Sequence, residues 1–216
     1  MKKQTLFLLI LCILSFVGHL FIFPMMPDVV PSHWDLNGEI NGYSNKLSTI
    51  FIALLPLFML LLFHFIPRID PRGENYKKHQ KAYDVFCTIM VLFLIVALWI
   101  SNAAIFGYDI HMEQFVPIGV GIILLVSGNY MPQIRINYTL GIKTPWTLDN
   151  EWVWKKTHEM AGIVFCVTGI LMILCGFLHT SWMSKVSFAG ILLGVAWLEL
   201  YSYLMFRKWK REHPDR

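Results

Sequence analysis

The chain has 216 residues, of which 56% are hydrophobic and 15% are charged, and its mean hydropathy is +0.55. This composition excludes an ordinary soluble globular domain, in which roughly a quarter of the residues are charged. The hydrophobic residues also gather in blocks. Together these features predict an all-α integral membrane protein that forms a single membrane domain over residues 1–216.

Six apolar blocks are predicted to be transmembrane helices. Five of them run about 19–22 residues, the length with which a helix crosses roughly 30 Å of hydrocarbon. The fourth is shorter and contains proline and glycine, so its crossing rests on the distribution of charge. In chain order the blocks are Thr5–Phe23, Leu47–Ile66, Val85–Phe106, Phe115–Tyr130, Met160–Leu178 and Val186–Phe206.

Lysine and arginine residues are distributed very unevenly between the two sides that these blocks define. If all six blocks cross and the N-terminus is cytoplasmic, 16 of the 18 Lys and Arg residues are cytoplasmic and only Lys46 and Lys185 lie outside. Cytoplasmic loops of membrane proteins are enriched in these residues. We therefore predict six transmembrane helices with both termini in the cytoplasm. The net charge of +4 reflects this topology and does not indicate a nucleic-acid partner.

The N-terminus and the cysteines carry no sign of processing or of a metal site. Lys2 and Lys3 precede an apolar run, as in a signal peptide, but Phe16 stands where cleavage needs a small residue, so we expect a retained helix. The four cysteines form no CxxC pair, so neither a zinc site nor a disulfide framework is predicted. His158 and Glu159 begin a zincin-like pattern whose second histidine is missing. No catalytic residue, metal or cofactor is expected.

Residues 24–46 are predicted to form an extracellular loop. Pro31, Asn37-Gly38 and Asn41-Gly42 favour tight turns. One interpretation is an ordered cap with aromatic anchors at the membrane interface; the other is a recognition surface for a molecule that arrives from outside. Composition favours the cap. The candidate recognition residues are His33, Trp34, Asp35, Asn41, Tyr43 and Lys46.

Residues 128–162 form a polar, aromatic segment that we place on the cytoplasmic side. Its tryptophans suit a membrane anchor, but residues 141–147 need defined turns and offer hydroxyl groups that an anchor does not require, so a specific role is favoured. Thr147 is expected to cap a helix whose first turn holds Asp149 and Glu151. The candidate residues are Asn129, Arg135, Asn137, Lys143, Thr144, Trp146, Thr147, Trp154 and His158.

Two features inside the apolar blocks add structural expectations. Glu199 lies seven residues from Phe206, hence about 10 Å inside the last block, where a carboxylate is costly unless it is protonated or paired. We hypothesise a cluster of Glu199 with Asn129 and His158, against the alternative of a purely structural hydrogen bond. Glycines at regular spacing predict close packing of the fifth and sixth helices. These glycines are Gly162, Gly169, Gly176, Gly190 and Gly194.

The two polar segments carry recognisable residue patterns. The outer one contains Pro31, His33-Trp34, Gly38, Asn41-Gly42-Tyr43 and Lys46. The inner one contains Gly128-Asn129, Met131-Pro132, Asn137, Gly141–Leu148, Trp154 and His158. Together they resemble the SdpI family of bacterial membrane proteins, and the outer pattern resembles the DUF1648-like segment at the start of many of them. Lys143 departs from the arginine common in that family, which keeps the charge but loses bidentate geometry.

The resemblance implies an immunity protein of the bacterial cytoplasmic membrane, surrounded by lipid, which protects its cell against a secreted, SDP-like amphipathic peptide toxin. It further implies that the protein holds a soluble ArsR-type repressor at the inner face, as part of signal transduction. On this interpretation the outer candidates bind the toxin, and the inner segment meets the cytosolic partner.

Two other classes of function stay open at this stage. A small transporter or exporter using Glu199 is supported by Pro56, which predicts a kink, and by the glycine-broken fourth block; the lack of an internal repeat and the sparse intramembrane charge oppose it. A membrane enzyme is the third interpretation, and no nucleophile–base spacing supports it. Its residues would be Asn129, Arg135, Lys143 and His158. Binding without catalysis is therefore expected.

Overall fold

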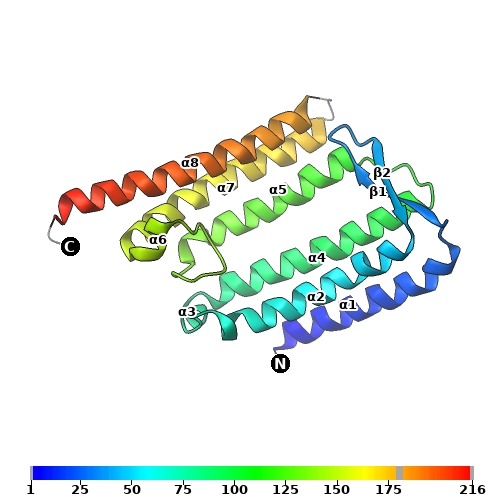
Figure 1. The fold of residues 1–216 in the computed structure, drawn as a ribbon, viewed down its shortest axis with the longest axis horizontal. Coiled ribbons are helices and arrows are strands. Elements are labelled where there is room, and N and C mark those ends of the chain that lie inside the picture. Colours follow the sequence, from blue (N-terminus) through cyan, green and yellow to red (C-terminus); the bar gives the residue numbers. More distant parts are fainter. Residues whose placement is uncertain (1, 179–181, 215–216) are drawn as a thin grey trace. The chain divides into compact units, whose positions relative to one another are not determined.

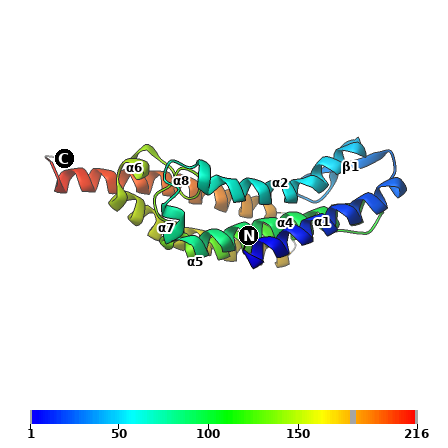
Figure 2. The same ribbon diagram turned by 90° about the horizontal axis from the view of Figure 1, so that it is seen from below.

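Six long helices dominate the computed structural model, which describes residues 2–178 and 182–214 (Figure 1; Figure 2). Each is long and apolar enough to cross a membrane, which confirms the predicted all-α, six-helix membrane protein. Several extend beyond the predicted blocks, because polar residues at the ends continue the helices. They are α1 (Lys3–Ile22), α2 (Leu47–Ile69), α4 (Gln80–Ile105), α5 (Met112–Tyr130), α7 (Glu151–Leu178) and α8 (Met183–Glu212).

The helices contribute to two compact units. The first contains the chain up to Phe65 together with Cys87–Phe115, and the second contains Ile66–Phe86 and the chain from Val116 onward. Helices α2, α4 and α5 each pass from one unit to the other. The single membrane domain expected from the sequence stays a prediction.

In the first unit, buried polar side chains join α1, α2 and α4. His19 is fully buried; its Nε2 lies 3.1 Å from Thr49 Oγ1 of α2, and its Nδ1 lies 3.2 Å from Asn102 Nδ2 of α4. The indole of Trp99 donates a hydrogen bond of 2.9 Å to Ser15 Oγ. Polar groups in an apolar environment are stable only when paired, so these contacts specify how the three helices pack.

Residues 24–46 are more ordered than the expected loop. After the 3-10 turn η1 (Phe23–Met25), strands β1 (Val29–Trp34) and β2 (Ile40–Asn45) form an antiparallel hairpin. Val30 is buried in a cluster with Met26 and Ile105. Gly38 has a φ of 83° in the connecting turn, a conformation that favours glycine.

In the second unit, the close approach of helices at glycine occurs between α5 and α7. A Cβ atom on Gly169 would lie 2.6 Å from the carbonyl oxygen of Gly121, and one on Gly128 would lie 2.9 Å from that of Gly162. Packing of α7 against α8 is confirmed, with Gly190 and Gly194 of α8 near side chains of α7. Gly162 and Gly169 of α7 lie against α5 and not against α8, because α5 supplies matching glycines, Gly121 and Gly128, at the same seven-residue spacing.

The loop between α5 and α7 contains the 3-10 turn η2 (Met131–Gln133) and the short helix α6 (Pro145–Asp149), which packs against α7 (Figure 1). Thr144 caps α6, and the Thr144 and Thr147 side chains bond reciprocally to each other's backbone amides. The expected Thr147 cap is therefore wrong. Asn150 Oδ1 instead accepts hydrogen bonds from the amides of Trp152 and Val153 at the start of α7.

Candidate functional site

Asp70 holds the loop between α5 and α7 from outside the loop itself. The carboxylate, which follows α2, is 9% exposed. It accepts hydrogen bonds from the Arg72 amide (2.8 Å), the Tyr76 hydroxyl (2.9 Å), the Tyr138 amide (2.9 Å) and the Thr139 hydroxyl (3.0 Å). Burial alone would raise its pKa, but these hydrogen bonds favour the charged form and leave the pKa below its ordinary value.

Asn137 organises the loop from within. The side chain is fully buried, and its Oδ1 accepts hydrogen bonds from the amides of Thr139 (2.9 Å) and Leu140 (2.6 Å). Its Nδ2 donates to the carbonyl oxygens of Arg135 (2.8 Å) and Leu140 (2.9 Å). An amide group can serve as donor and acceptor at once, so this one residue satisfies four backbone groups of an irregular, buried segment.

Trp154 and His158 of α7 bind the other end of the loop. The Trp154 indole donates a hydrogen bond of 2.8 Å to the carbonyl oxygen of Ile134. His158 is fully buried and stacks on Trp154, with 4.0 Å between the ring centroids. Its Nδ1 donates to the carbonyl oxygen of Trp154 (2.8 Å), which leaves Nε2 to accept from the Ile142 amide (3.1 Å).

Glycine is required at Gly141, beside this histidine. Its φ is 111°, and a Cβ atom there would collide with His158 Nε2. The tight backbone therefore brings the Ile142 amide within reach of the imidazole. The predicted residues Asn137, Thr144, Thr147, Trp154 and His158 are all brought together here, and all five are buried.

His79 forms a further link to the loop. It lies between α3 (Asn75–Lys78) and α4, is 3% exposed, and its Nδ1 accepts a hydrogen bond of 3.1 Å from the Arg135 amide. Burial lowers the pKa of His79, the charge of Arg135 lowers it further, and Asp70 opposes both. The neutral imidazole is thus the form that holds the loop.

Four of the predicted inner residues have accessible side chains. Arg135 and Asn129 are exposed, and Trp146 is half-buried with its ring centroid 5.1 Å from that of Tyr203. Lys143 is also exposed, and its ammonium donates to the carbonyl oxygens of Tyr138 (3.3 Å) and Thr139 (2.8 Å). The surface that the loop presents is therefore basic and aromatic, which suits binding.

The hypothesised intramembrane cluster is not formed. His158 is buried against the loop, whereas Asn129 and Glu199 are exposed on α5 and α8. No hydrogen bond within residues 2–178 and 182–214 joins the three side chains. In the same residues, no group of three or more His, Cys, Asp or Glu side chains is placed to hold a metal ion.

In the hairpin, two of the predicted recognition residues act in folding. Asp35 Oδ1 accepts hydrogen bonds from the amides of Asn37 (2.8 Å) and Glu39 (3.0 Å), which close the turn and lower the pKa of its carboxyl group. Lys46 Nζ lies 2.8 Å from a carboxylate oxygen of Asp28 at the base of the hairpin. These contacts fix the turn and the base.

The other predicted hairpin residues are more accessible. His33 and Asn41 are exposed and hydrogen-bonded to each other across the strands, and Trp34 is half-buried opposite Ile40. Tyr43 is 63% exposed. The hairpin also has exposed apolar side chains, namely Val29, Leu36 and Ile40.

Asp70, His79 and His19 were not identified from the sequence. A histidine within an apolar block indicates a buried polar contact, because buried polar groups need partners. His19 is such a residue, and its position could have predicted the contacts that it makes. In the sequence, the segment around Asp70 and His79 is distinguished only by its basic residues, which indicate topology. Its partners Tyr138 and Arg135 lie more than fifty residues away along the chain, and local patterns do not reveal such pairs.

Comparison with known proteins places two matches on this chain. Residues 133–202 match the SdpI/YfhL protein family, and residues 10–60 match DUF1648, a domain of unknown function. The chain is 28% identical over 209 residues to Immunity protein SdpI of Bacillus subtilis (strain 168), covering 96% of this chain and 98% of that protein. No solved structure matches. The matches fall on both predicted segments, so the resemblance inferred from them is confirmed.

Proposed function

We propose that this multi-pass protein of the cell membrane, which resembles the SdpI family, is an immunity protein that protects its cell from a secreted peptide toxin. The observation that carries the proposal is the similarity to Immunity protein SdpI along nearly the full length of both chains. A relationship of that extent includes both the hairpin and the loop between α5 and α7. The roles of the residues are proposals of their own.

The accessible surface of the hairpin is the proposed toxin-binding site. Val29, Leu36, Ile40 and Tyr43 are exposed apolar or aromatic side chains, and the His33–Asn41 pair adds polar groups between the strands. An amphipathic peptide offers apolar and polar groups together. Because Asp35 and Lys46 are engaged in the turn and the base, we assign them a positioning role in this binding.

Expression in a toxin-sensitive bacterium tests the proposal. Cells that carry the protein in their membrane should survive toxin at a concentration that kills the parent strain. Tyr43→Ala should lower protection about tenfold, since buried aromatic side chains contribute strongly to binding, whereas Tyr108→Ala, at a tyrosine that is 70% exposed, should not. Undiminished killing at confirmed membrane expression contradicts the immunity function.

The exposed cations of the inner loop are the proposed docking site for a soluble ArsR-type repressor. Lys143 and Arg135 are exposed on a loop that buried hydrogen bonds hold in one conformation, and a rigid surface loses little entropy on binding. A fluorescent repressor should move to the membrane when toxin is present, and Lys143→Gln should reduce this recruitment while Lys155→Gln should not. A repressor that stays cytosolic in all cases removes the signalling role and leaves immunity intact.

Transport through Glu199 has less support. The side chain is exposed on α8 and does not line the cavity between α4, α5 and α7, so this cavity does not provide a pathway that passes it. Ion-driven flux in proteoliposomes that disappears in Glu199→Gln would favour transport over immunity.

A further inference from the structure

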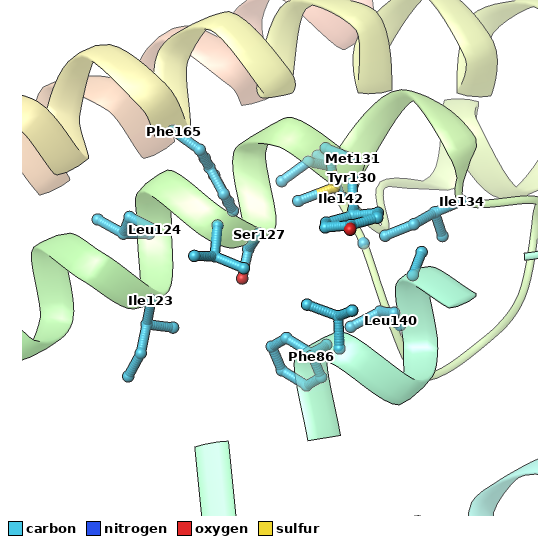
Figure 3. Close-up of a pocket in the computed structure, with 14 residues that line it drawn as sticks. Phe86, Ile123, Leu124, Ser127, Tyr130, Met131, Ile134, Leu140, Ile142 and Phe165 are labelled. Atoms are coloured by element: carbon cyan, nitrogen blue, oxygen red, sulfur yellow. The ribbon is translucent and has the colours of Figure 1, made fainter. Parts of the chain in front are cut away.

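A cavity of about 170 Å³ lies among α4, α5, α7 and the loop between α5 and α7 (Figure 3). Phe86 of α4 forms one wall, Leu124 and Ser127 of α5 form another, and Leu140 and Ile142 of the loop close one end. An apolar cavity of roughly 150 Å³ can hold a molecule the size of benzene. The space therefore accommodates a short length of hydrocarbon.

The lining of the cavity includes an unpaired hydroxyl group. The Ser127 hydroxyl oxygen is buried and has no hydrogen-bond partner within residues 2–178 and 182–214, and the close-up shows it directed into the space opposite Phe86 (Figure 3). Buried hydroxyl groups are almost always paired. A ligand of pure hydrocarbon would leave this one unsatisfied, whereas a ligand with an oxygen acceptor beside its hydrocarbon chain would satisfy it.

Positive charge adjoins the same cavity. Lys81 precedes the lining residue Ala82, and Arg135 follows the lining residue Ile134. Both side chains are exposed, and neither forms an ion pair within the part of the chain that the structure describes. Ser127 lies three residues before Tyr130 on α5, hence about 5 Å further along the helix. From the loop end of the cavity along α5, the cation Arg135 beside Ile134 comes first, the hydroxyl of Ser127 comes next, and the hydrocarbon side chain of Leu124 lies beyond it.

We propose that this cavity binds one acyl chain of an anionic phospholipid. The phosphate interacts with Lys81 and Arg135, the ester carbonyl accepts a hydrogen bond from Ser127, and the first carbons of the acyl chain lie among Phe86, Ile123 and Leu124. Phospholipid has the same order of groups as the site, and basic pockets between membrane helices favour anionic headgroups. Helix α5 crosses the membrane, so the cavity opens where phospholipid is the surrounding medium. This proposal is independent of immunity.

Photolabelling tests it on the whole protein in nanodiscs. The probe is phosphatidylglycerol with a diazirine in the acyl chain, and labelled residues are mapped by mass spectrometry. We expect labels on Tyr130, Met131 and their neighbours. Val126→Phe, at a lining position, should reduce that label about fivefold or more, whereas Val116→Phe, the same change at an exposed position of α5, should not. Equal labelling in both variants overturns the proposal.

Two further variants keep the proposal falsifiable if Val126→Phe does not fold. Ser127→Ala removes an unpaired hydroxyl and should preserve folding while it reduces the label about twofold or more. The double variant Lys81→Gln/Arg135→Gln should lose the preference for phosphatidylglycerol over phosphatidylcholine, whereas Lys155→Gln/Arg211→Gln should keep it. Three results would contradict the assignment. The labelling could be unchanged in Ser127→Ala, it could show no headgroup preference in the wild type, or it could arise only from a free fatty acid that carries the same diazirine.

Discussion

Asp70 illustrates how single buried residues determine the conformation of the functional loop. Its carboxylate accepts four hydrogen bonds, two of them from Tyr138 and Thr139 in the loop. Hydrogen bonds to charged groups contribute roughly 1.5–3 kcal/mol each, so this residue can hold the loop although it belongs to another segment of the chain.

Asp70→Asn should therefore release the loop while leaving the helices in place. An asparagine directs an NH₂ group toward some of the four donors, and we expect destabilisation of about 2 kcal/mol or more, since buried donors lose their partner. Limited trypsin digestion of the purified protein measures the release, because Arg135 and Lys143 lie in the loop. Cleavage there should become several-fold faster in the variant. Asp149→Asn, at an exposed carboxylate of the same loop region, is the control and should leave the rate unchanged.

His79 makes the stability of the second unit sensitive to pH. Its pKa is lowered in the folded protein from the ordinary value of 6.5, so the unfolded chain binds the proton more readily. The contribution of His79 is thus complete above pH 6.5 and declines as the pH falls below it. The pKa of Asp70 is lowered from 3.8, and its contribution is lost only at pH values below 3.8.

The melting temperature measured from pH 7.5 to pH 5 tests this dependence. The wild type should lose more stability over this range than His79→Gln, because the variant has no imidazole to protonate at that position. Other histidines are present in both proteins, so the difference between the two curves isolates His79. His33→Gln, at an exposed histidine, should follow the wild-type curve. Parallel curves for the wild type and His79→Gln would contradict the assignment.

Among the elements, the loop and the hairpin show which local structure can be predicted. Helical length and hydrophobicity predict the six helices, since these depend on residues close in sequence. Of the three turns predicted in the hairpin, the one at Asn37-Gly38 is confirmed. The other two are wrong, because Pro31 lies within β1 and Asn41-Gly42 lies within β2. The sequence predicts a cap at Thr147 for a helix that begins just before Asp149, whereas Thr144 caps α6 and Asn150 binds the first amides of α7. Threonine and asparagine both suit a cap, so residue type alone does not identify the position.

The glycine contacts between α5 and α7 lead to a prediction about packing. Gly169→Ala places a methyl group 2.6 Å from the carbonyl oxygen of Gly121, and the backbones must separate. We expect a loss of about 1–3 kcal/mol, the usual effect of overpacking, visible as a lower melting temperature in detergent.

Gly190→Ala on α8 is the matched control. A Cβ atom there would meet the flexible end of Leu171 at 3.3 Å and the methyl group of Thr168 at 4.0 Å, and alanine favours a helix over glycine by about 1 kcal/mol. The melting temperature of this variant should stay level or rise. If the two variants melt alike, the contact between α5 and α7 is not as close as described.

At the scale of the whole molecule, burial separates the positions that fold the protein from those that can bind. Of the predicted inner residues, Asn137, Thr144, Thr147, Trp154 and His158 are buried and hydrogen-bonded, whereas Arg135 and Lys143 remain exposed. The sequence indicated that the segment is specialised, but it did not distinguish these two groups. Burial depends on residues such as Asp70 and His79 that pair with the loop over a long distance along the chain.

The membrane topology leads to the last prediction, on which both proposed binding surfaces depend. All six helices have the length and apolar composition of transmembrane helices. Three of them separate the hairpin from the loop between α5 and α7 along the chain, so we predict that these two segments face opposite sides of the membrane, with the loop in the cytoplasm as the distribution of Lys and Arg indicates. In a variant without the four native cysteines, a single cysteine at Leu36 should react with an impermeant maleimide in intact cells. One at Asp149 should react only after permeabilisation.

Both positions are exposed, so an unreactive cysteine reflects its side of the membrane and not burial. Reaction of both in intact cells would mean that an even number of helices crosses between the hairpin and the loop, where three are expected. The hairpin and the basic loop could then not face a toxin and a cytosolic partner respectively.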